Sequence, residues 1–459
     1  MPGRPVRGSR SIRSLFAVVL VLAGVTAAVC AAPGRPRSAV LFIGDGMGPA
    51  YVTTTRVARG GSGGRLRIDS LPYTALSRTH SSDSPVTDSA AAASAMGCGQ
   101  KTANGVLCED ASAVYGKSDG RKLESIAVWA KKRGLRVGLV TTTTVTHATP
   151  AAFYAQEKNR DNEAGIARQA AGCGFDLILG GGRKYFPDDV RKEAQAAGFT
   201  IVETAEALRG IGGLDRRILG LFAEGYLPYQ PEIEAARARP AGAAAGESGA
   251  AGATGVAGGA AGASGGGEAA GDPVARTAPT LVEMTRFAID ALRKTGQPFF
   301  LMVEGGRIDH AGHANWARTL VDETAAFDEA IGYAVDTLDP KTTLVLVTAD
   351  HETGGLALNG YPDEKDGIWS PYRDPYGDKD EEPYPVITFT SGPGTKKQDR
   401  HPPHGSDDPR PSGLSMVSAA HTGVDVALYA WGAGADRVHG TVENTEIYTI
   451  LKEHLEGRK

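Results

Sequence analysis

Short apolar runs with the length of single strands recur along this chain, and helix-compatible stretches such as Lys122–Arg133 separate several of them. The runs are Ala39–Ile43, Arg136–Thr142, Phe175–Leu179, Pro298–Val303, Thr343–Thr348 and Val424–Ala430. Alternation of this kind predicts an α/β fold whose central, mostly parallel sheet has helices on both faces. In sheets of this type, sites form beyond the carboxyl ends of the strands.

Residues with metal-ligand chemistry follow several of these runs. They are Asp45 after the first run, His147 and Thr149 after the second, Glu304 after the fourth, and Asp350 with His351 after the fifth. A single Asp–His pair is a weak sign, because most histidines are ordinary surface or core residues. The same pattern at several strand ends is stronger, and it predicts a metal cluster at one edge of the sheet.

The spacing of these residues indicates which of them can share an ion. Asp309 and His313 stand four residues apart, so on a helix or a tight turn they share one face. Asp350 and His351 are adjacent and can share an ion only from a loop. Mixed Asp/His sets suit catalytic zinc. A set of carboxylates and a hydroxyl suits magnesium, and the set of this kind here is Asp45, Thr149 and Glu304.

Ser89 stands at the start of a predicted helix. The run Ala90–Met96 has no β-branched residue and a high helix propensity, and Asp88 is a suitable N-cap. The free amides and the positive end of such a helix favour a serine alkoxide and a phosphoryl group. Asp88 and Ser89 can also be a capping pair only, which the local sequence by itself favours. No Gly-x-Ser-x-Gly elbow surrounds the serine, which argues against an ordinary Ser/His/Asp triad and for activation by a metal.

Arg160 is a candidate for phosphate recognition, because a planar guanidinium matches two phosphate oxygens. The local sequence alone favours a solvated helix charge instead. The whole chain has a net charge of -4 and a pI near 6.2, so it exerts no general attraction for nucleic acid or anionic lipid. Attraction for an anionic substrate must therefore be local.

The first residues carry several arginines, and an apolar run from Leu15 to about Ala32 follows them and ends in small residues. This pattern predicts a secretory signal peptide over residues 1–32, and hence a periplasmic or secreted mature protein. An uncleaved membrane anchor is the alternative, although the run is slightly short for the roughly 20 apolar residues that a span needs. Lipid attachment at Cys30 is a third option, which the residues before that cysteine match poorly.

Beyond the leader, residues 38–457 of the 459-residue chain are enough for one large α/β domain with insertions. Residues 241–270 use only Ala, Gly, Ser, Thr, Val and Glu. Such a segment has almost nothing to bury, so we expect a disordered insertion there. Residues 360–413 are rich in Pro, Asp and Tyr and include Trp369, and we expect a loop-rich inserted subdomain there.

Three cysteines remain beyond the leader, which is an odd number for an oxidising compartment. Cys98 and Cys108 can close a short loop, or both can be buried reduced thiols. The sequence does not decide between these two states, and Cys173 is left over in either case.

Taken together, the motifs resemble those of the alkaline phosphatase family. The segment Val86–Ala91 is similar to that family's nucleophile signature, and the likeness continues through Lys101–Gly105. Further matching segments are Phe42–Gly48, Thr144–Pro150, Glu304–His313, Val347–Gly355 and His421–Gly423. These segments follow the order of the family over residues 38–457, which makes the resemblance highly specific.

The resemblance implies roles for individual residues. Ser89 would be the nucleophile that becomes phosphoserine, and Arg160, held by Asp88, would bind the phosphoryl oxygens. The first zinc would be bound by Asp309, His313 and His421, the second zinc by Asp45, Asp350 and His351, and magnesium by Asp45, Thr149 and Glu304. The division agrees with metal chemistry, because one zinc would stabilise the leaving oxygen while the other favours the serine alkoxide.

Two positions vary within the family. One carries His147 where aspartate also occurs, and we count this histidine among the metal ligands. The other carries His310, for which we expect a role in substrate binding. A histidine at position 147 removes a negative charge beside the magnesium site, so we expect weaker magnesium binding, and the third metal can differ.

Three other functions compete with this one. The nucleophile segment of sulfatases has the pattern Cys/Ser-x-Pro-x-Arg. The segment that starts at Ser89 lacks both the proline and the arginine. A phosphodiesterase needs room for a second ester group, whereas Arg160 would occupy the free phosphate oxygens. A non-catalytic binder of metal or phosphate would not need Ser89, and it would keep its function in Ser89→Ala.

The sequence thus predicts a secreted alkaline phosphatase with two zinc ions and one magnesium ion, which hydrolyses small phosphate monoesters through phosphoserine. No nucleic acid partner is implied, and no stable membrane span after signal cleavage. The family is commonly dimeric, so a homodimer is one expected assembly. The sequence leaves the physiological substrate open.

Overall fold

The computed structural model describes residues 37–239, 273–362, 367–369, 371–372, 384–394 and 409–458. The predicted signal peptide (1–32) and the predicted Gly/Ala-rich insertion (241–270) lie outside the described residues, as do parts of the second predicted insertion (360–413).

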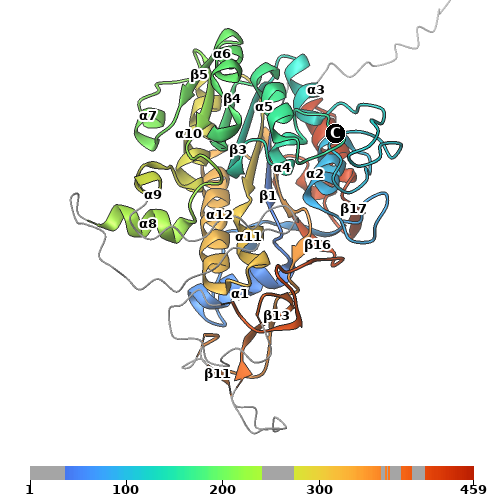
Figure 1. The fold of residues 1–459 in the computed structure, drawn as a ribbon, viewed down its shortest axis with the longest axis vertical. Coiled ribbons are helices and arrows are strands. Elements are labelled where there is room, and N and C mark those ends of the chain that lie inside the picture. Colours follow the sequence, from blue (N-terminus) through green and yellow to red (C-terminus); the bar gives the residue numbers. More distant parts are fainter. Residues whose placement is uncertain are drawn as a thin grey trace, which may run out of the picture.

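A ten-stranded sheet forms the centre of the molecule (Figure 1). Its strand order is β17-β2-β16-β8-β1-β7-β3-β4-β6-β5. The strands are β1 Ser38–Gly44, β2 Tyr73–Arg78, β3 Arg136–Thr144, β4 Leu177–Gly181, β5 Phe199–Val202, β6 Arg217–Leu221, β7 Phe299–Gly305, β8 Thr343–Ala349, β16 Val426–Gly432 and β17 Thr441–Glu443. Strands β8 to β5 in this order pair in parallel, whereas β16 is antiparallel to both β8 and β2. The predicted central, mostly parallel sheet is confirmed.

The register of the central strands decides where polar residues gather. Ile43 of β1 lies opposite Glu304 of β7 and Thr348 of β8, and Thr141 of β3 lies opposite the same glutamate. Parallel strands that pair in this register end at the same edge of the sheet. The residues that follow β1, β3, β7 and β8 therefore meet at that edge.

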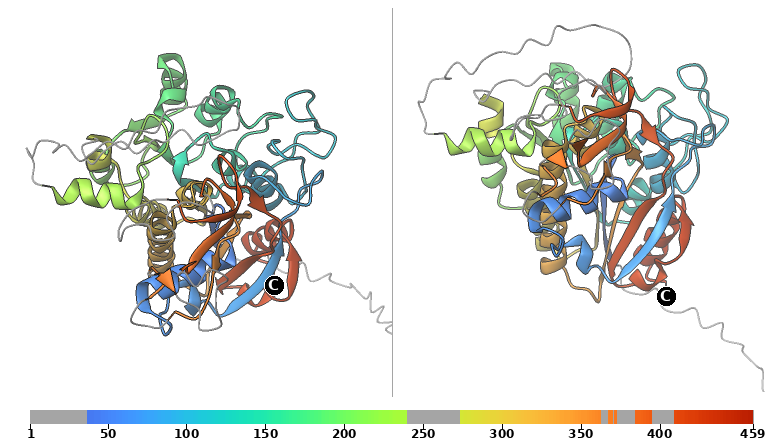
Figure 2. Two further views of the ribbon diagram at one scale, coloured as in Figure 1. Left: turned by 60° about the horizontal axis from the view of Figure 1, so that its bottom comes forward. Right: turned by 90° about the horizontal axis from the view of Figure 1, so that it is seen from below.

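Helices cover both faces of the sheet (Figures 1 and 2). One face packs against α2 Ser89–Cys98, α3 Ile126–Lys132, α4 Ala148–Ala151, α5 Glu163–Gly172, α6 Asp188–Ala196 and α13 Glu446–Leu455. The other face packs against α1 Pro49–Gly60, α7 Ala205–Arg209, α8 Gln230–Ala238, α10 Leu281–Lys294, α11 Arg307–His313 and α12 Ala317–Thr337, with α9 Pro273–Thr277 nearby. Side chains of β1 alternate between the two cores, since Leu41 and Ile43 face the first and Val40 and Phe42 face the second.

Short strands outside the main sheet complete the fold. A three-stranded sheet is built from β10 Ala357–Leu358, β13 Ile387–Gly392 and β14 Ser412–Ser415, and a two-stranded one from β11 Pro371–Tyr372 and β12 Tyr384–Pro385. A third pairing joins β9 Glu352–Thr353 to β15 His421–Thr422, with His421 opposite Thr353. This last pairing brings His421 beside His351. The paired residues Glu352 and Thr422 are 70 positions apart in the sequence.

The predicted helix over residues 122–133 is shorter than expected. Helix α3 begins at Ile126, because the Ser125 side chain accepts a hydrogen bond from Val128 N–H at 3.2 Å and caps the helix there. Single-turn 3-10 helices lie at Ile68–Ser70, Arg183–Tyr185 and Ala435–Arg437.

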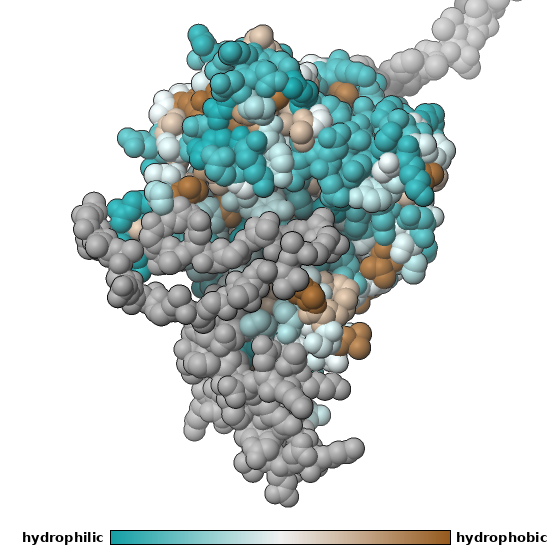
Figure 3. All heavy atoms as spheres, in the orientation of Figure 1, coloured by the Kyte–Doolittle hydropathy of each residue, from teal (hydrophilic) through white to brown (hydrophobic). Residues whose placement is uncertain are grey.

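The described surface visible in Figure 3 is mainly hydrophilic, with separate apolar patches, as expected when helices bury the apolar strands. Within the described ranges, none of the helices combines the length and the apolar character that crossing a membrane requires.

Candidate active site

Ser89 is the first residue of α2, as predicted, and its side chain is buried, with only 3% of the residue exposed. The Asp88 carboxylate caps this helix by accepting a hydrogen bond from Ala91 N–H at 2.9 Å. The Oγ atom of Ser89 lies 3.2 Å from Nε2 of His351. The serine hydroxyl thus lies at the positive end of a ten-residue helix and beside an imidazole from the loop after β8.

Arg160 is fixed beside the start of the same helix. Its Nη1 donates to Oδ2 of Asp88 at 3.0 Å, and its Nη2 lies 3.2 Å from Nε2 of His147. The same Oδ2 accepts a hydrogen bond from Gly105 N–H, and the carbonyl of Gly105 accepts one from Arg160 N–H, both at 2.9 Å. The ion pair that the family resemblance implied between Asp88 and Arg160 is present.

Acidic and histidine side chains form three groups at the carboxyl edge of the sheet, and within each group the ligand atoms lie within 4.8 Å of one another. The groups are Asp309, His351 and His421; Asp45, Asp350 and His351; and Asp45, His147 and Glu304. Asp45 and His351 each belong to two groups, so the three form one continuous cluster.

The first predicted zinc set meets around α11. Nε2 of His313 lies 3.2 Å from Oδ2 of Asp309 and 3.2 Å from Nε2 of His421. The four-residue spacing of Asp309 and His313 therefore places both on one helix face, as predicted. His351 borders this set as well, since its ring stacks on that of His421 with 3.6 Å between the ring centroids.

The second predicted zinc set surrounds His351. Its Nε2 lies 3.3 Å from Oδ2 of Asp350 and 3.6 Å from Oδ1 of Asp45. Thr353 was not predicted as part of the site, yet its Oγ1 bonds Oδ1 of Asp309 and lies 3.3 Å from Nδ1 of His351. Thr353 therefore orients one residue from each predicted zinc set.

The third predicted set lies between β1, β3 and β7. Thr149 donates to Oδ2 of Asp45 at 3.5 Å, and Nδ1 of His147 lies 3.8 Å from Oε1 of Glu304. Two further hydroxyls, which were not predicted, orient the same glutamate: Thr141 and Thr143 both donate to its Oε2, the latter at 3.2 Å. The run of four threonines at the end of β3 was the only sequence signal for these contacts.

The charges in the cluster suit bound cations. Burial, together with the charges of Asp350 and Asp309, raises the pKa of Asp45 well above its ordinary value, and burial raises the pKa of Asp350 to about 7. Burial also raises the pKa of Asp309, but His313 and His421 reverse that effect and lower the pKa well below its ordinary value. Burial lowers the pKa of His351, which favours the neutral imidazole that binds metals.

Several polar atoms of the cluster are buried without a hydrogen-bond partner among the described residues. They are Oδ1 of Asp45, Nδ1 of His147, Oε1 of Glu304 and Oδ2 of Asp350. Buried polar atoms normally have partners, and all four belong to the predicted metal ligands. The three carboxylate oxygens among these atoms therefore fit divalent cations in both chemistry and position.

His310 lies beside the third set rather than within it. Its ring centroid is 5.9 Å from that of His147 and 4.4 Å from that of Tyr226, and its Nδ1 lies 2.9 Å from Nη1 of Arg307. Burial and the Arg307 charge lower the pKa of His310 well below its ordinary value. Neither Tyr226 nor Arg307 was predicted as part of the site, because Tyr226 stands outside every motif and Arg307 is one of several arginines.

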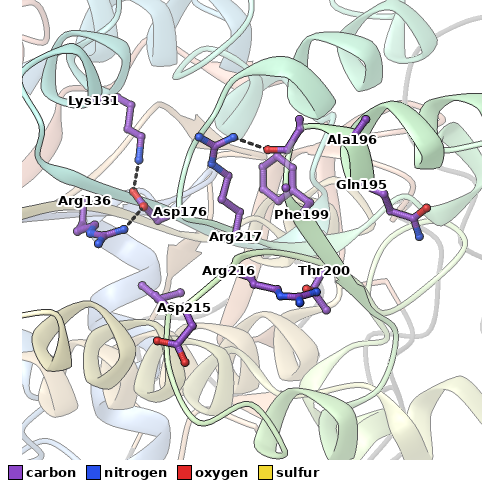
Figure 4. A pocket seen from close by; sticks show the side chains of 13 residues that line it. Lys131, Arg136, Asp176, Gln195, Ala196, Phe199, Thr200, Asp215, Arg216 and Arg217 are labelled. Atoms are coloured by element: carbon purple, nitrogen blue, oxygen red, sulfur yellow. Dashed lines mark hydrogen bonds and ion pairs between the residues drawn. The ribbon is translucent and has the colours of Figure 1, made fainter.

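A cavity of about 590 Å³ lies at the opposite edge of the sheet, by the first residues of β3, β5 and β6 (Figure 4). Its charged lining includes Asp176, which pairs with Lys131 at 2.6 Å and with Arg136 at 2.8 Å. None of the predicted site residues lines it. The candidate catalytic chemistry is thus concentrated at the carboxyl edge of the sheet and not in this cavity.

Comparisons with known proteins point to one family. A family model described as alkaline phosphatase matches residues 37–456. The tissue-nonspecific alkaline phosphatase of Rattus norvegicus is 32% identical over an alignment of 453 positions, and the alignment covers 90% of this chain and 83% of that protein. The crystal structure of Thermus thermophilus alkaline phosphatase matches with a TM-score of 0.67 and 26% identity, over 93% of this chain and 92% of that one. A histidine-to-aspartate mutant of TAB5 alkaline phosphatase, with Mg bound in its M3 site, matches with a TM-score of 0.65 and 25% identity, over 93% of this chain and 99% of that one. The chain therefore belongs to the alkaline phosphatase family and is a hydrolase of phosphate monoesters.

Proposed function

We propose that this protein hydrolyses small phosphate monoesters through a phosphoserine intermediate on Ser89, at a site that binds two zinc ions and one magnesium ion. The observation that carries the proposal is the position of the Ser89 hydroxyl. It lies at the N-terminus of α2 and 3.2 Å from His351, which belongs to two of the three metal-ligand groups. A helix N-terminus stabilises both an alkoxide and a transferred phosphoryl group.

The donor sets support this choice of metals. Zinc would be held by Asp309, His313 and His421 and by Asp45, Asp350 and His351, and magnesium by Asp45, Thr149 and Glu304, with His147 at its border. When bound, these ions would neutralise the buried carboxylates, favour the serine alkoxide, stabilise the leaving oxygen and lower the pKa of the attacking water.

The chain's own residues account for binding and phosphoryl transfer. Asp88 and His147 hold the two Nη atoms of Arg160, so the plane of the guanidinium is fixed and its remaining N–H donors can bind two phosphoryl oxygens. The Ser89 oxygen attacks phosphorus, the bond to the ester oxygen breaks, and the alcohol leaves. Water then attacks the phosphoserine, which releases inorganic phosphate and restores the hydroxyl.

Replacing Arg160 by alanine should raise both the KM for a monoester and the inhibition constant of inorganic phosphate by roughly tenfold to a hundredfold, because two charge-assisted hydrogen bonds are lost. Both constants of Arg160→Lys should lie between those of the parent and those of Arg160→Ala, because lysine keeps the positive charge but cannot donate two parallel hydrogen bonds. Steady-state kinetics measures both constants. Arg168→Ala, at an exposed arginine of α5, is the matched control and should change neither constant. Unchanged phosphate inhibition in Arg160→Ala would contradict the assigned role.

His147→Asp should raise the affinity of the third site for magnesium by roughly tenfold or more. A neutral imidazole has one N–H and one lone pair. If Nε2 of His147 accepts the hydrogen bond from Arg160, the proton lies on Nδ1, and the atom that faces Glu304 has no lone pair for a metal. Aspartate offers oxygens in both directions and adds a negative charge. The TAB5 mutant of the same type, with Mg in its M3 site, supports this expectation.

Calorimetric titration of the zinc-loaded protein with magnesium measures this affinity without relying on turnover. The zinc content of both proteins serves as the internal control and should be equal. Equal magnesium affinity in the two proteins would show that His147 does not limit the third site.

We also propose that residues 1–32 are a cleaved signal peptide, that the mature protein is periplasmic or secreted, and that residues 38–457 form one catalytic domain with insertions at 241–270 and 360–413. The basic and apolar pattern of the leader and the composition of the two insertions support this division. N-terminal sequencing of the exported protein tests the cleavage.

The activity itself is tested by hydrolysis of a chromogenic phosphate monoester, beside a matched diester and a sulfate ester, with zinc and magnesium and again after chelation. We expect chelator-sensitive turnover dominated by the monoester. Preference for either other ester would assign the site to a different hydrolase, and the absence of all three activities would favour a binding protein.

A further inference from the structure

We propose that Cys98 and Cys108 form a disulfide bond that ties the end of helix α2 to the loop that positions Arg160. The two Sγ atoms lie 2.7 Å apart. Heavy atoms that are not bonded to each other normally stay about 3.5–4.0 Å apart, so the distance between the two sulfurs is shorter than a non-bonded contact. A disulfide bond would need the sulfurs only about 0.7 Å closer. Both cysteines are buried, with 6% and 1% of their surfaces exposed. The chain's third cysteine beyond the leader, Cys173, lies elsewhere, directly after α5.

The backbone at Cys108 is an independent sign of a restraint at this position. Its φ angle is +46°, in the left-handed region that residues other than glycine rarely adopt. Such a conformation persists where the surroundings impose it. The backbone is held on both sides, because Cys108 N–H donates to Ser94 Oγ at 2.9 Å and its carbonyl accepts from Leu123 N–H at 2.8 Å. Its sulfur also lies 2.8 Å from the carbonyl oxygen of Ala152, and oxidation removes the S–H donor of that contact.

The loop between the two cysteines supports the proposed phosphate-binding side chains. Asn104 accepts a hydrogen bond from Asp88 N–H at 3.0 Å, and Gly105 binds both the carboxylate of Asp88 and the backbone of Arg160. Leu107 exchanges two backbone hydrogen bonds with Glu157, three residues before Arg160, at 2.8 and 3.0 Å. A bond from Cys98 to Cys108 would therefore anchor this loop to the C-terminal end of α2, the helix whose N-cap is Asp88.

The bond forms by exchange with a disulfide donor such as oxidised glutathione or a thiol–disulfide oxidoreductase. The thiolate of one cysteine attacks the donor disulfide, which forms a mixed disulfide and releases one donor thiolate. The second cysteine thiolate then attacks the protein sulfur of that mixed disulfide, which forms the Cys98–Cys108 bond and releases the other donor thiol. The protein loses two electrons and two protons, and the donor gains both. Because both sulfurs are buried in the folded protein, exchange must precede the packing of α2.

Peptide mapping tests the bond without relying on activity. Full-length protein is equilibrated with oxidised glutathione during folding, denatured, alkylated without reduction, digested and analysed by mass spectrometry. We expect the Cys98 and Cys108 peptides to be linked, with a combined mass two hydrogens below that of the free thiols, and Cys173 to be alkylated. Alkylation of both Cys98 and Cys108 would overturn the proposal. The same linkage in inactive protein would separate a failure of the proposed function from a failure of this inference.

The positioning effect, which rests on the proposed role of Arg160, is tested with Cys98→Ala against the matched control Cys173→Ala. We expect Cys98→Ala to raise the KM and the inhibition constant of phosphate by roughly threefold to tenfold, with a smaller change in kcat, because a looser loop mispositions the phosphate contact. Cys173→Ala should match the parent protein. Reduction of the unfolded parent, followed by refolding with reductant, should reproduce the Cys98→Ala kinetics. Equal phosphate inhibition in both variants and in the reduced parent would contradict the positioning effect.

Discussion

Ser89→Ala is expected to lower kcat for a phosphate monoester by at least about a thousandfold, because no other nucleophile replaces the hydroxyl at the start of α2. Alanine at this position keeps the helix and its Asp88 cap, and Ser89 is not a member of any of the three metal-ligand groups. Metal content and melting temperature should therefore stay at the parent values. Stopped assays of phosphate release, metal analysis and calorimetry measure the three quantities.

Two further variants test whether the loss of turnover is specific to the Ser89 hydroxyl. Ser89→Cys keeps a nucleophilic atom and should retain more turnover than alanine. Ser94→Ala removes a hydroxyl from the same helix that bonds Cys108 N–H and lies outside the metal-ligand groups, so its turnover should stay within about threefold of the parent. Substantial turnover in Ser89→Ala with intact metals would show that water attacks the substrate directly.

Asp45→Asn is expected to lower kcat/KM by at least about a hundredfold and to release metal from more than one position. Asp45 is fully buried at the end of β1, and its two oxygens face different partners: Oδ1 lies 3.6 Å from His351, and Oδ2 accepts from Thr149. Asparagine has the same shape but lacks the charge and replaces one oxygen with a donor. Metal analysis after dialysis should show loss of both the second zinc and magnesium.

Thermal unfolding supplies a second readout for the same variant. Chelation should lower the melting temperature of the parent protein markedly, because ions that bind only the folded state stabilise it and four buried carboxylates remain behind. Asp45→Asn removes one of these four acidic groups, so chelation should lower its melting temperature less. Asp69→Asn is the matched control, since Asp69 pairs with Arg56 away from the cluster, and it should keep all metals. Equal metal content in Asp45→Asn and the parent would contradict the shared-ligand role.

The central strands were predictable because they are continuous apolar runs buried on both faces. The structure places β1, β3, β7 and β8 within about two residues of the predicted runs. Strands β2, β5, β6 and β17 were not predicted, since they are short or partly exposed, as with Leu76 of β2, which is 46% exposed. The antiparallel direction of β16 is also absent from its sequence, because an apolar run has no direction and only the pairing with β8 and β2 fixes it.

The meeting of the candidate metal-ligand residues at one edge of the sheet was predictable for a different reason. Each stands next to a strand end or within a motif, and a parallel sheet brings its strand ends together. His421 needed the additional pairing of β9 and β15. The family resemblance implied that His421 belongs to the site, but no pattern in the sequence predicted this pairing. Supporting residues such as Thr353 and Tyr226 were missed, because their contacts depend on the register and loop geometry of the folded chain.

The most direct measurement is to mix the zinc- and magnesium-loaded protein with a phosphate monoester, quench it in acid within the first turnovers, and map phosphorylation by mass spectrometry. A phosphoryl group on the peptide that starts the Ala90–Met96 run, localised to Ser89 and absent from Ser89→Ala, is the result that a phosphoserine pathway predicts. Full turnover with no phosphorylated Ser89 at any quench time, or phosphorylation of another residue, would contradict it.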